Sequence, residues 1–140
     1  MGFWIFMLIM DMMIPLIMIG FGKLFLNRAP KEINPVYGYR TSMSMKNKDT
    51  WEFAHAYFGK VWFRIGIVML PVSIIPLFFV LGRNTNTVGM VGGALCIVQC
   101  VVLLVSIFPV EKALKRNFDS NGRRRSEAVQ KSEGTQIESR

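Results

Sequence analysis

Two side chains in this sequence could do chemistry by virtue of where they stand, and the first is an aspartate inside an apolar run. Asp11 is the single charged residue between Phe3 and Phe21. A carboxylate in such a run costs about 2.5 to 3.5 kcal/mol on membrane-insertion scales, which makes it a candidate functional group. At 1.5 Å per helical residue, Asp11, Ser73 and Gln99 lie about 12, 12 and 16 Å below one membrane boundary. We expect these three side chains to form one polar layer, which serves either as structural hydrogen bonding or as a path for protons or ions.

The second candidate is Arg40, which follows the glycine turn at Gly38 and precedes Thr41. A guanidinium group has five donors in a planar fork and suits bidentate capture of a phosphate or a carboxylate. Four aromatic residues near it could wall such a pocket: Tyr37, Tyr39, Trp51 and Tyr57. Arg40 could equally bond to carbonyl groups of its own loop and hold the turn, and the sequence leaves both interpretations open.

Other residue types that often carry chemistry point to packing instead. Cys96 and Cys100 are four residues apart in an apolar run, a helical spacing that does not bring their Cβ vectors together for a disulfide. A metal site built from them and His55 would have to join the middle of a bilayer to a helix outside it. The sequence also contains no nucleophile beside a base, no paired carboxylates and no phosphate-binding loop. We therefore expect no enzymatic activity, no metal and no cofactor, with His55 packed on an apolar stripe.

Three apolar runs must position these residues. The 140-residue chain is 51% hydrophobic, and residues 3–22, 61–81 and 88–109 each reach the length of about 20 residues that crosses a hydrocarbon core. We predict an all-α membrane protein with three transmembrane helices that form a single module over residues 1–125. Residues 126–140 are polar, so we expect this tail to be disordered.

Basic residues predict the orientation of the module. The chain has 17 Lys and Arg against 9 Asp and Glu, and most of the basic residues lie between the first two runs or after the third. The hairpin between the second and third runs has Arg83 alone. Because loops rich in Lys and Arg stay on the cytoplasmic side, the N-terminus should be outside and the C-terminus inside. The net charge of +8 then serves topology and attraction to anionic headgroups, and we expect no direct binding of nucleic acid.

The loop before the second run combines a turn with a helix. Residues 34–60 begin with the turn formers Asn34, Pro35 and Gly38, and "DTWE" reads as a capping box made by Asp49 and Glu52. Six residues then form one apolar stripe at helical spacing: Trp51, Ala54, His55, Phe58, Trp62 and Ile65. We expect a cytoplasmic loop, followed by an amphipathic helix at the membrane interface that enters the second span with a bend near Gly59.

Gly89 and Gly93 open the third run with the small-xxx-small spacing that lets two helix backbones approach closely. The spacing fits packing against the first or second helix. It also fits an oligomer interface.

The loop segments "NPVYGYRT", "SMKNKDTW" and "FAHAYFGK" resemble the signature of the SdpI family of bacterial membrane proteins. The matching positions are Asn34, Pro35, Gly38, Arg40, Thr41, Trp51 and Gly59, while His55 stands where the family usually has Asn. The family's namesake protects cells from a secreted toxin, holds a transcriptional repressor at the membrane, and carries further spans upstream of this module. The resemblance thus implies a short, module-only member in the bacterial cytoplasmic membrane, with a peptide toxin or a cytoplasmic regulator protein as partner.

Function remains open at this level. The resemblance implies a non-enzymatic protein of the immunity and signal-transduction type. The polar layer of Asp11, Ser73 and Gln99 is compatible instead with a small permease or a channel-like subunit. A membrane scaffold without a ligand would need neither the loop nor the polar layer for activity.

Overall fold

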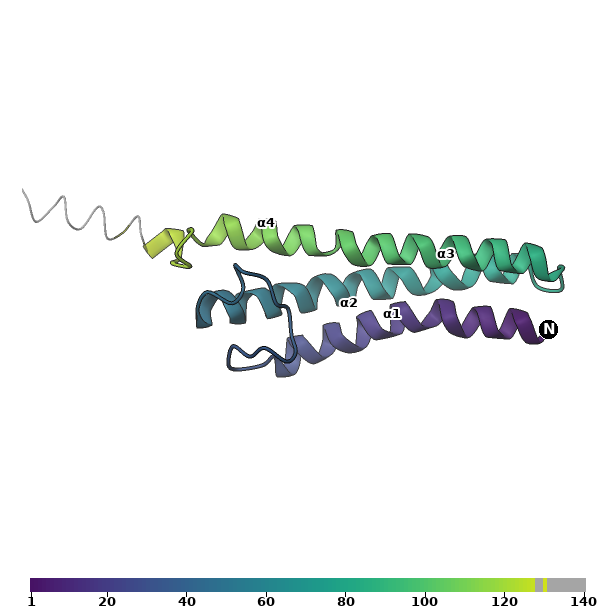
Figure 1. The fold of residues 1–140 in the computed structure, drawn as a ribbon, viewed down its shortest axis with the longest axis horizontal. Helices are drawn as coiled ribbons and strands as arrows, with labels where there is room; N and C mark the ends of the chain where they lie inside the picture. The colour runs from purple at the N-terminus through teal and green to yellow at the C-terminus, as the bar shows by residue number, and fades with distance from the viewer. Residues whose placement is uncertain (128–129, 131–140) are drawn as a thin grey trace, which may run out of the picture.

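The computed structural model describes residues 1–127 and 130, which form a bundle of long helices (Figure 1). The helices are α1 (Gly2–Arg28), α2 (Lys48–Phe79), α3 (Thr85–Val105) and α4 (Ile107–Asn117). Three segments are long and apolar enough to cross a membrane: Gly2–Arg28, Lys48–Phe79 and Thr85–Asn117. The prediction of an all-α membrane protein with three spans is therefore confirmed, and each expected span overlaps one of these segments.

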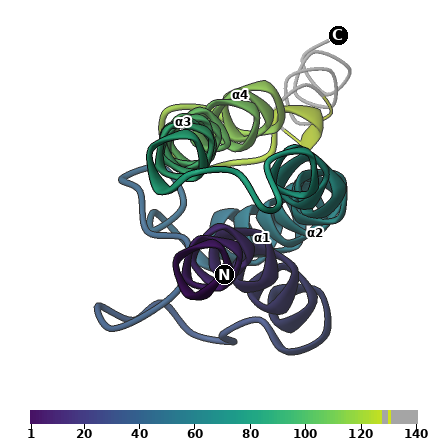
Figure 2. The ribbon, with the colours of Figure 1, turned by 90° about the vertical axis from the view of Figure 1, so that its right-hand side faces the viewer.

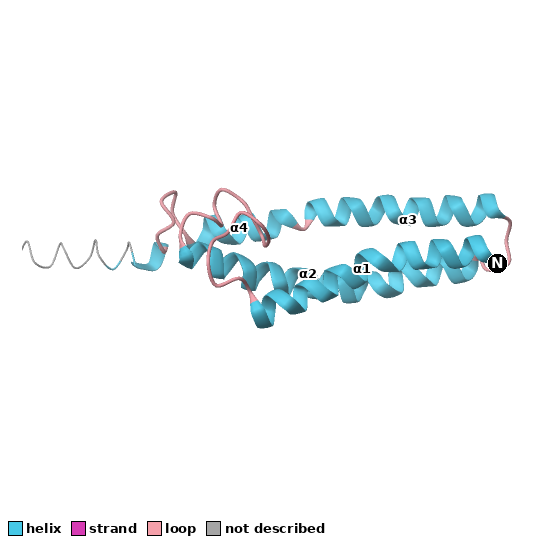
Figure 3. Cartoon of the chain, turned by 60° about the horizontal axis from the view of Figure 1, so that its bottom comes forward, coloured by secondary structure: helices cyan, strands magenta, loops and turns pink. Residues whose placement is uncertain are grey.

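The two ends of the bundle differ in construction. One end, called here the hairpin end, holds the N-terminus and the short connection 80–84 between α2 and α3 (Figure 1). The other, called here the loop end, holds the connection 29–47 between α1 and α2 together with α4. Seen along the bundle, the three long helices stand at the corners of a triangle (Figure 2). The connection 29–47 folds over the loop end as irregular chain (Figure 3).

Helix α2 begins where the sequence indicates but with a different cap. The Asn47 side chain accepts a hydrogen bond from the Thr50 backbone at 2.9 Å, and the Thr50 hydroxyl accepts one from the Asn47 backbone at 3.1 Å. This reciprocal pair satisfies donors at the helix start. The expected capping box of Asp49 and Glu52 is thus wrong by two residues, because Asn47 already occupies the cap position.

Residues 48–60 form the first turns of α2, and the helix runs on to Phe79 without interruption. Trp51, Ala54, His55 and Phe58 of the expected apolar stripe are buried. They lie in or beside a core that also includes Tyr39 of the loop and Leu114 of α4. The segment is therefore amphipathic, as expected, but its apolar side faces protein. Trp51 is fully buried within the protein.

Close contact between α1 and α2 depends on glycines. A Cβ atom at Gly22 would lie 2.5 Å from the backbone nitrogen of Phe63, and one at Gly59 would lie 2.9 Å from the carbonyl oxygen of Gly22. Two turns further along α2, a Cβ atom at Gly66 would lie 3.0 Å from the carbonyl oxygen of Pro15. Small residues at such positions allow membrane helices to pack backbone against backbone.

Within the third apolar segment, α3 stops at Val105 and α4 begins at Ile107. Helix α4 continues to Asn117, and a turn at 119–122 follows, where "DSNG" predicts one. Phe118 and Arg124 then form an isolated antiparallel bridge. The predicted disorder of 126–140 falls almost entirely outside the residues that the structure describes.

Candidate functional site

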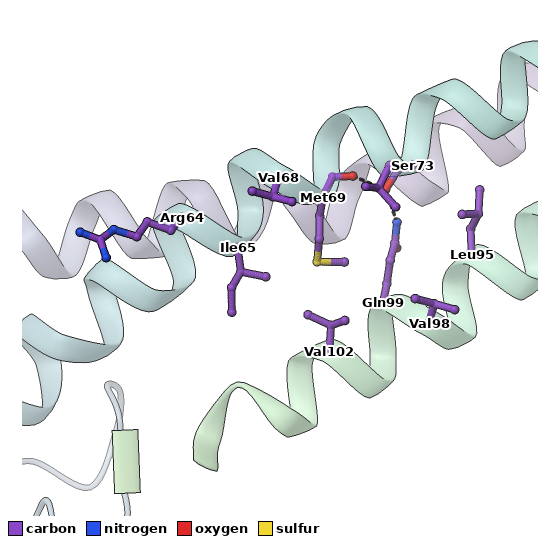
Figure 4. Close-up of a pocket in the computed structure, with 10 residues that line it drawn as sticks. Arg64, Ile65, Val68, Met69, Ser73, Leu95, Val98, Gln99 and Val102 are labelled. Carbon is purple, nitrogen blue, oxygen red and sulfur yellow. Dashed lines mark hydrogen bonds between the residues drawn. The ribbon is translucent and has the colours of Figure 1, made fainter. Parts of the chain in front are cut away.

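The three residues expected to form a polar layer meet inside the bundle. Asp11, Ser73 and Gln99 come from α1, α2 and α3, and all three are buried. The Gln99 Nε2 atom donates to the Ser73 hydroxyl at 2.7 Å and to the backbone carbonyl of Asp11 at 2.8 Å. The Ser73 hydroxyl in turn donates to the Met69 carbonyl at 2.8 Å (Figure 4). One glutamine side chain thus links all three spans.

The contact between Gln99 and the Asp11 carbonyl follows from the proline in α1. Pro15 has no backbone N–H, so the carbonyl four residues earlier, that of Asp11, has no helical donor. The Gln99 amide supplies the missing hydrogen bond. A neighbouring helix thereby satisfies a group that hydrocarbon could not satisfy.

The Asp11 carboxylate has a further contact that the sequence did not suggest. Its Oδ1 atom accepts a hydrogen bond from the Cys96 thiol at 2.9 Å, whereas we expected Cys96 only to pack. Cys96 lies three residues before Gln99 and so faces the same way on α3, a spacing that could have identified it. Among the described residues, the buried atoms Asp11 Oδ2 and Gln99 Oε1 have no hydrogen-bond partner. The layer therefore has unused capacity to bind a proton or a donor.

The other expected site, the motif loop, forms a compact structure at the loop end. We use the name loop-end cap for residues 30–47, the first three turns of α2, α4 and the turn 118–124. Its core contains side chains from every one of these parts and from Phe25 of α1. Family-motif residues occupy specific positions within it.

Gly38 and His55 define the centre of the cap. Gly38 has a φ of +116°, a conformation that favours glycine, and a Cβ atom there would collide with the His55 ring. The Tyr39 backbone N–H donates to His55 Nε2 at 2.9 Å, and His55 Nδ1 donates to the Trp51 carbonyl at 2.8 Å. These two bonds require a neutral imidazole with its proton on Nδ1. His55 therefore fastens the loop to α2, where it is packed as expected.

Tyrosine and tryptophan side chains connect the cap to its neighbours. The Tyr39 hydroxyl donates to Glu111 at 2.9 Å, and burial together with the nearby Glu111 carboxylate raises the Tyr39 pKa well above its ordinary value. Trp51 Nε1 donates to the Pro30 carbonyl at 2.8 Å. Trp62 Nε1 donates to Ser106 at 2.9 Å, where α3 gives way to α4. The sequence marks these aromatics as apolar or interfacial, and their polar partners are far away in the chain.

Asn34 and Thr41 shape the loop itself. The Asn34 side chain accepts hydrogen bonds from the backbone of Val36 and Tyr37 at 3.1 and 3.0 Å, as in an Asx turn. The Thr41 hydroxyl accepts a hydrogen bond from the Ser44 backbone, and the Ser44 hydroxyl accepts one from the Thr41 backbone, at 3.2 and 2.9 Å. Pro35 is exposed within the Asn34 turn.

The turn 118–124 closes the cap from the C-terminal side. Asn47 Nδ2 donates to the Gly122 carbonyl at 2.6 Å, and Lys46 donates to the Ser120 carbonyl. The Phe118 ring meets Phe53 edge to face with a centroid distance of 5.4 Å. The two basic segments of the chain are thus joined at one end of the bundle.

Arg40 is the exposed charged member of the motif. Its Nη1 atom lies 3.5 Å from the Val36 carbonyl, the outer limit of a hydrogen bond. Tyr39 and Trp51 point into the cap, so they do not wall a pocket around Arg40 as the sequence suggested, while Tyr37 is exposed. The guanidinium remains available to an anionic group at the surface.

Two expectations about glycines remain: a bend of the second helix near Gly59, and close helix packing at Gly89 and Gly93. Gly59 is buried against α1 inside an uninterrupted α2. A Cβ atom at Gly89 would contact Phe3 at 3.6 Å, whereas nothing lies within 4 Å of one at Gly93. The close glycine approach between α3 and α1 is made at Gly92, where a Cβ atom would meet Met7 and would lie 3.2 Å from Asp11 Oδ2.

Comparison with known proteins agrees with these motif positions. Residues 31–110 match the SdpI/YfhL protein family, which is more than half of the 140 residues. The uncharacterized protein YfhL of Bacillus subtilis (strain 168) is 33% identical over 97 residues, which cover 69% of this chain and 78% of that relative. No solved structure gives a significant match. Because the matched region contains the whole motif from Asn34 to Gly59, the resemblance is confirmed, and the chain belongs to the SdpI/YfhL protein family.

Proposed function

We propose that this chain is a non-enzymatic protein of the bacterial cytoplasmic membrane that takes part in toxin immunity and signal transduction. In this proposal a peptide toxin is received from outside or from the lipid phase, and the loop-end cap is presented to a cytoplasmic regulator. One observation carries the proposal most directly. The cap gathers residues of α1, α2 and α4 into one core, so a displacement of any of these three helices would alter the surface around Arg40.

The proposed orientation places the loop end in the cytoplasm. Its support is the basic residues of 23–60 and 112–125, which the cap brings to the same end of the bundle, and the positive-inside rule. A reporter that works only in the cytoplasm should be active when fused after Arg140 and inactive when fused after Asn84. The reverse pattern would overturn the orientation and with it a cytoplasmic partner.

Arg40 is the residue that we expect to contact the partner. Its side chain is exposed and makes a single long contact within its own loop, so the planar fork is free to bind a carboxylate or a phosphate. Lysine keeps the charge but lacks the fork. Loss of one charge-assisted hydrogen bond of about 1.5 to 3 kcal/mol corresponds to binding weaker by about 10- to 150-fold.

The test combines gene deletion with re-expression of variants and challenge by supernatants of related strains. Wild-type protein should restore resistance, and Arg40→Lys should fail at normal abundance in the membrane. Arg83→Lys, at the hairpin end, is the matched control and should behave as wild type. If Arg40→Lys protects fully, or fails only because the protein is lost from the membrane, Arg40 serves folding and the proposed contact is wrong.

A second candidate function is a small permease or channel-like subunit. It is favoured by the buried atoms Asp11 Oδ2 and Gln99 Oε1, which lack partners among the described residues. Asp11→Asn preserves hydrogen bonding but cannot release a proton. Loss of activity in this variant at normal abundance would support proton or ion movement, whereas retained activity would favour a structural layer. If neither Arg40→Lys nor Asp11→Asn changes activity, a scaffold without a ligand becomes the better account.

A further inference from the structure

A groove runs between α2 and α3 on the side of the bundle away from α1 (Figure 4). Its volume is about 400 Å³, and it is lined almost entirely by apolar side chains. Two valines of each helix face it, Val68 and Val72 on α2 and Val98 and Val102 on α3. This volume is within the range of about 300 to 1,000 Å³ typical of small-molecule sites.

The two ends of the groove differ in chemistry. Arg64 lies at the end nearest the loop, and its side chain extends away from the other lining residues (Figure 4). The described residues contain one ion pair, Lys48 with Glu52, so Arg64 has no ionic partner among them. Toward the other end lie Ser73 and Gln99, which are joined by the hydrogen bond of the polar layer, and Leu95 lines the groove one turn beyond Gln99 (Figure 4). The groove is thus apolar along its length, with the Arg64 cation at the end nearest the loop and the polar layer near the other end.

The length of the groove matches one leaflet of a bilayer. Nine residues separate Arg64 from Ser73, a rise of about 14 Å along the helix. A hydrocarbon core of about 30 Å gives each leaflet about 15 Å. The stretch from Arg64 to Ser73 therefore reaches from the loop-end boundary to about mid-bilayer, and Leu95 extends the lining by about one helical turn. A transmembrane helix would need a contact surface across both leaflets.

We infer that the groove binds one acyl chain of an anionic phospholipid from the loop-end leaflet, with the phosphate at Arg64. The acyl chain would fill the gap that α2 and α3 leave between them, and the methyl end of the acyl chain would lie near Gln99. The guanidinium would neutralise the headgroup at the boundary, a position to which long basic side chains extend. Three properties of the site favour this occupant: the positive charge of Arg64, the shape of the apolar groove, and the depth that the groove spans in the bilayer.

The test uses the full-length protein in vesicles of phosphatidylcholine with a minority of phosphatidylglycerol. Each lipid is supplied in turn as a probe with a photoreactive group on the acyl chain, and labelled residues are mapped by mass spectrometry. The phosphatidylglycerol probe should label Val68, Val72, Val98 and Val102 about fivefold more than the phosphatidylcholine probe, the preference expected for one basic residue near the surface. Equal labelling by the two probes would overturn the choice of an anionic lipid.

Two pairs of variants make the outcome specific. Arg64→Gln should abolish the preference for the anionic probe, and Arg64→Lys should keep most of it. Val98→Phe should reduce labelling of the groove by both probes, while Val101→Phe, at an equally exposed position of α3 outside the groove, should not. If labelling persists in Val98→Phe, the groove is not the site. If wild-type labelling disappears as cross-linked dimers form, a second copy of the chain occupies the groove instead.

Discussion

Helix α2 contacts α1 and α3 in two different ways, and the contrast shows what joins helices in a membrane. Against α1, glycines at 22, 59 and 66 bring backbone to backbone. Against α3, the groove leaves a gap, and the Gln99 amide bridges the helices at one level. Lipid is as apolar as the side chains it replaces, so helix association depends on close packing and on hydrogen bonds. The first interface uses packing, and the second depends on a few polar groups.

The strongest way to break the first interface is to add a methyl group where the backbones touch. Gly22→Ala would place a Cβ atom 2.5 Å from the nitrogen and 2.8 Å from the Cα atom of Phe63. Because backbone atoms cannot rotate away, we expect a loss of about 3 kcal/mol, measured as a lower unfolding temperature in detergent. Gly20→Ala on the same helix has nothing within 4 Å of its Cβ atom and should be neutral or slightly stabilising. Equal effects of the two variants would contradict the glycine-packed interface.

The second interface should be most sensitive at Gln99. Gln99→Leu removes hydrogen bonds to Ser73 and to the Asp11 carbonyl and leaves that carbonyl without a donor in the membrane. We expect a loss of about 2 kcal/mol, less than for Gly22→Ala, in the same unfolding measurement. Asp11→Leu should also destabilise, while Asp11→Asn should be nearly neutral. A stable Gln99→Leu variant would mean that packing alone holds α3 in place.

The cap adds a third link, from the loop to α4. Tyr39→Phe loses the hydrogen bond to Glu111 and should cost about 1 kcal/mol, with Tyr37→Phe, at an exposed tyrosine, as the control. Because folding raises the Tyr39 pKa, this contribution is complete below the unfolded value of about 10 and is lost as pH rises above it. The difference in stability between wild type and Tyr39→Phe should therefore shrink in alkaline buffer. A constant difference would argue against the phenol as donor.

The smallest expected effect distinguishes the two cysteines. Cys96→Ala removes the thiol donor to Asp11 Oδ1, and membrane hydrogen bonds of this kind average about 0.6 kcal/mol. Cys100 is exposed on α3, so Cys100→Ala should leave the unfolding temperature unchanged. Should both variants match wild type, the thiol contact contributes nothing measurable to the association of α3 with α1.

The sequence predicts correctly those parts of the structure that depend on hydrophobic periodicity and on depth in the membrane. Three long apolar runs predict three spans because hydrocarbon thickness fixes helix length. Equal depth also predicts that Asp11, Ser73 and Gln99 could meet, and the structure brings them together. The start of α2 was located within two residues, although the capping pair was misidentified.

Contacts between distant segments were beyond such reasoning. Nothing local shows that Tyr39 points at Glu111, or that Trp51 turns inward to the Pro30 carbonyl, because an aromatic next to an apolar span looks the same whether it meets lipid or protein. The sequence around Gly22 does not show that this residue packs against another helix, since its partner Phe63 lies far away in the chain, on α2. The family motif marked the loop as specific, but the cap that gives each motif residue its place requires the fold.

The proline in α1 also bears on the order in which the bundle assembles. Helices of a membrane protein insert before they associate, and α1 precedes α3 in the chain. Until α3 arrives, the Asp11 carbonyl that Pro15 deprives of its helical donor must face lipid or find a temporary partner. The hydrogen bonding of α1 is therefore completed by α3, through the Gln99 amide. A nascent chain that ends before Gln99 would carry this exposed carbonyl, which could distinguish an unfinished bundle from a complete one.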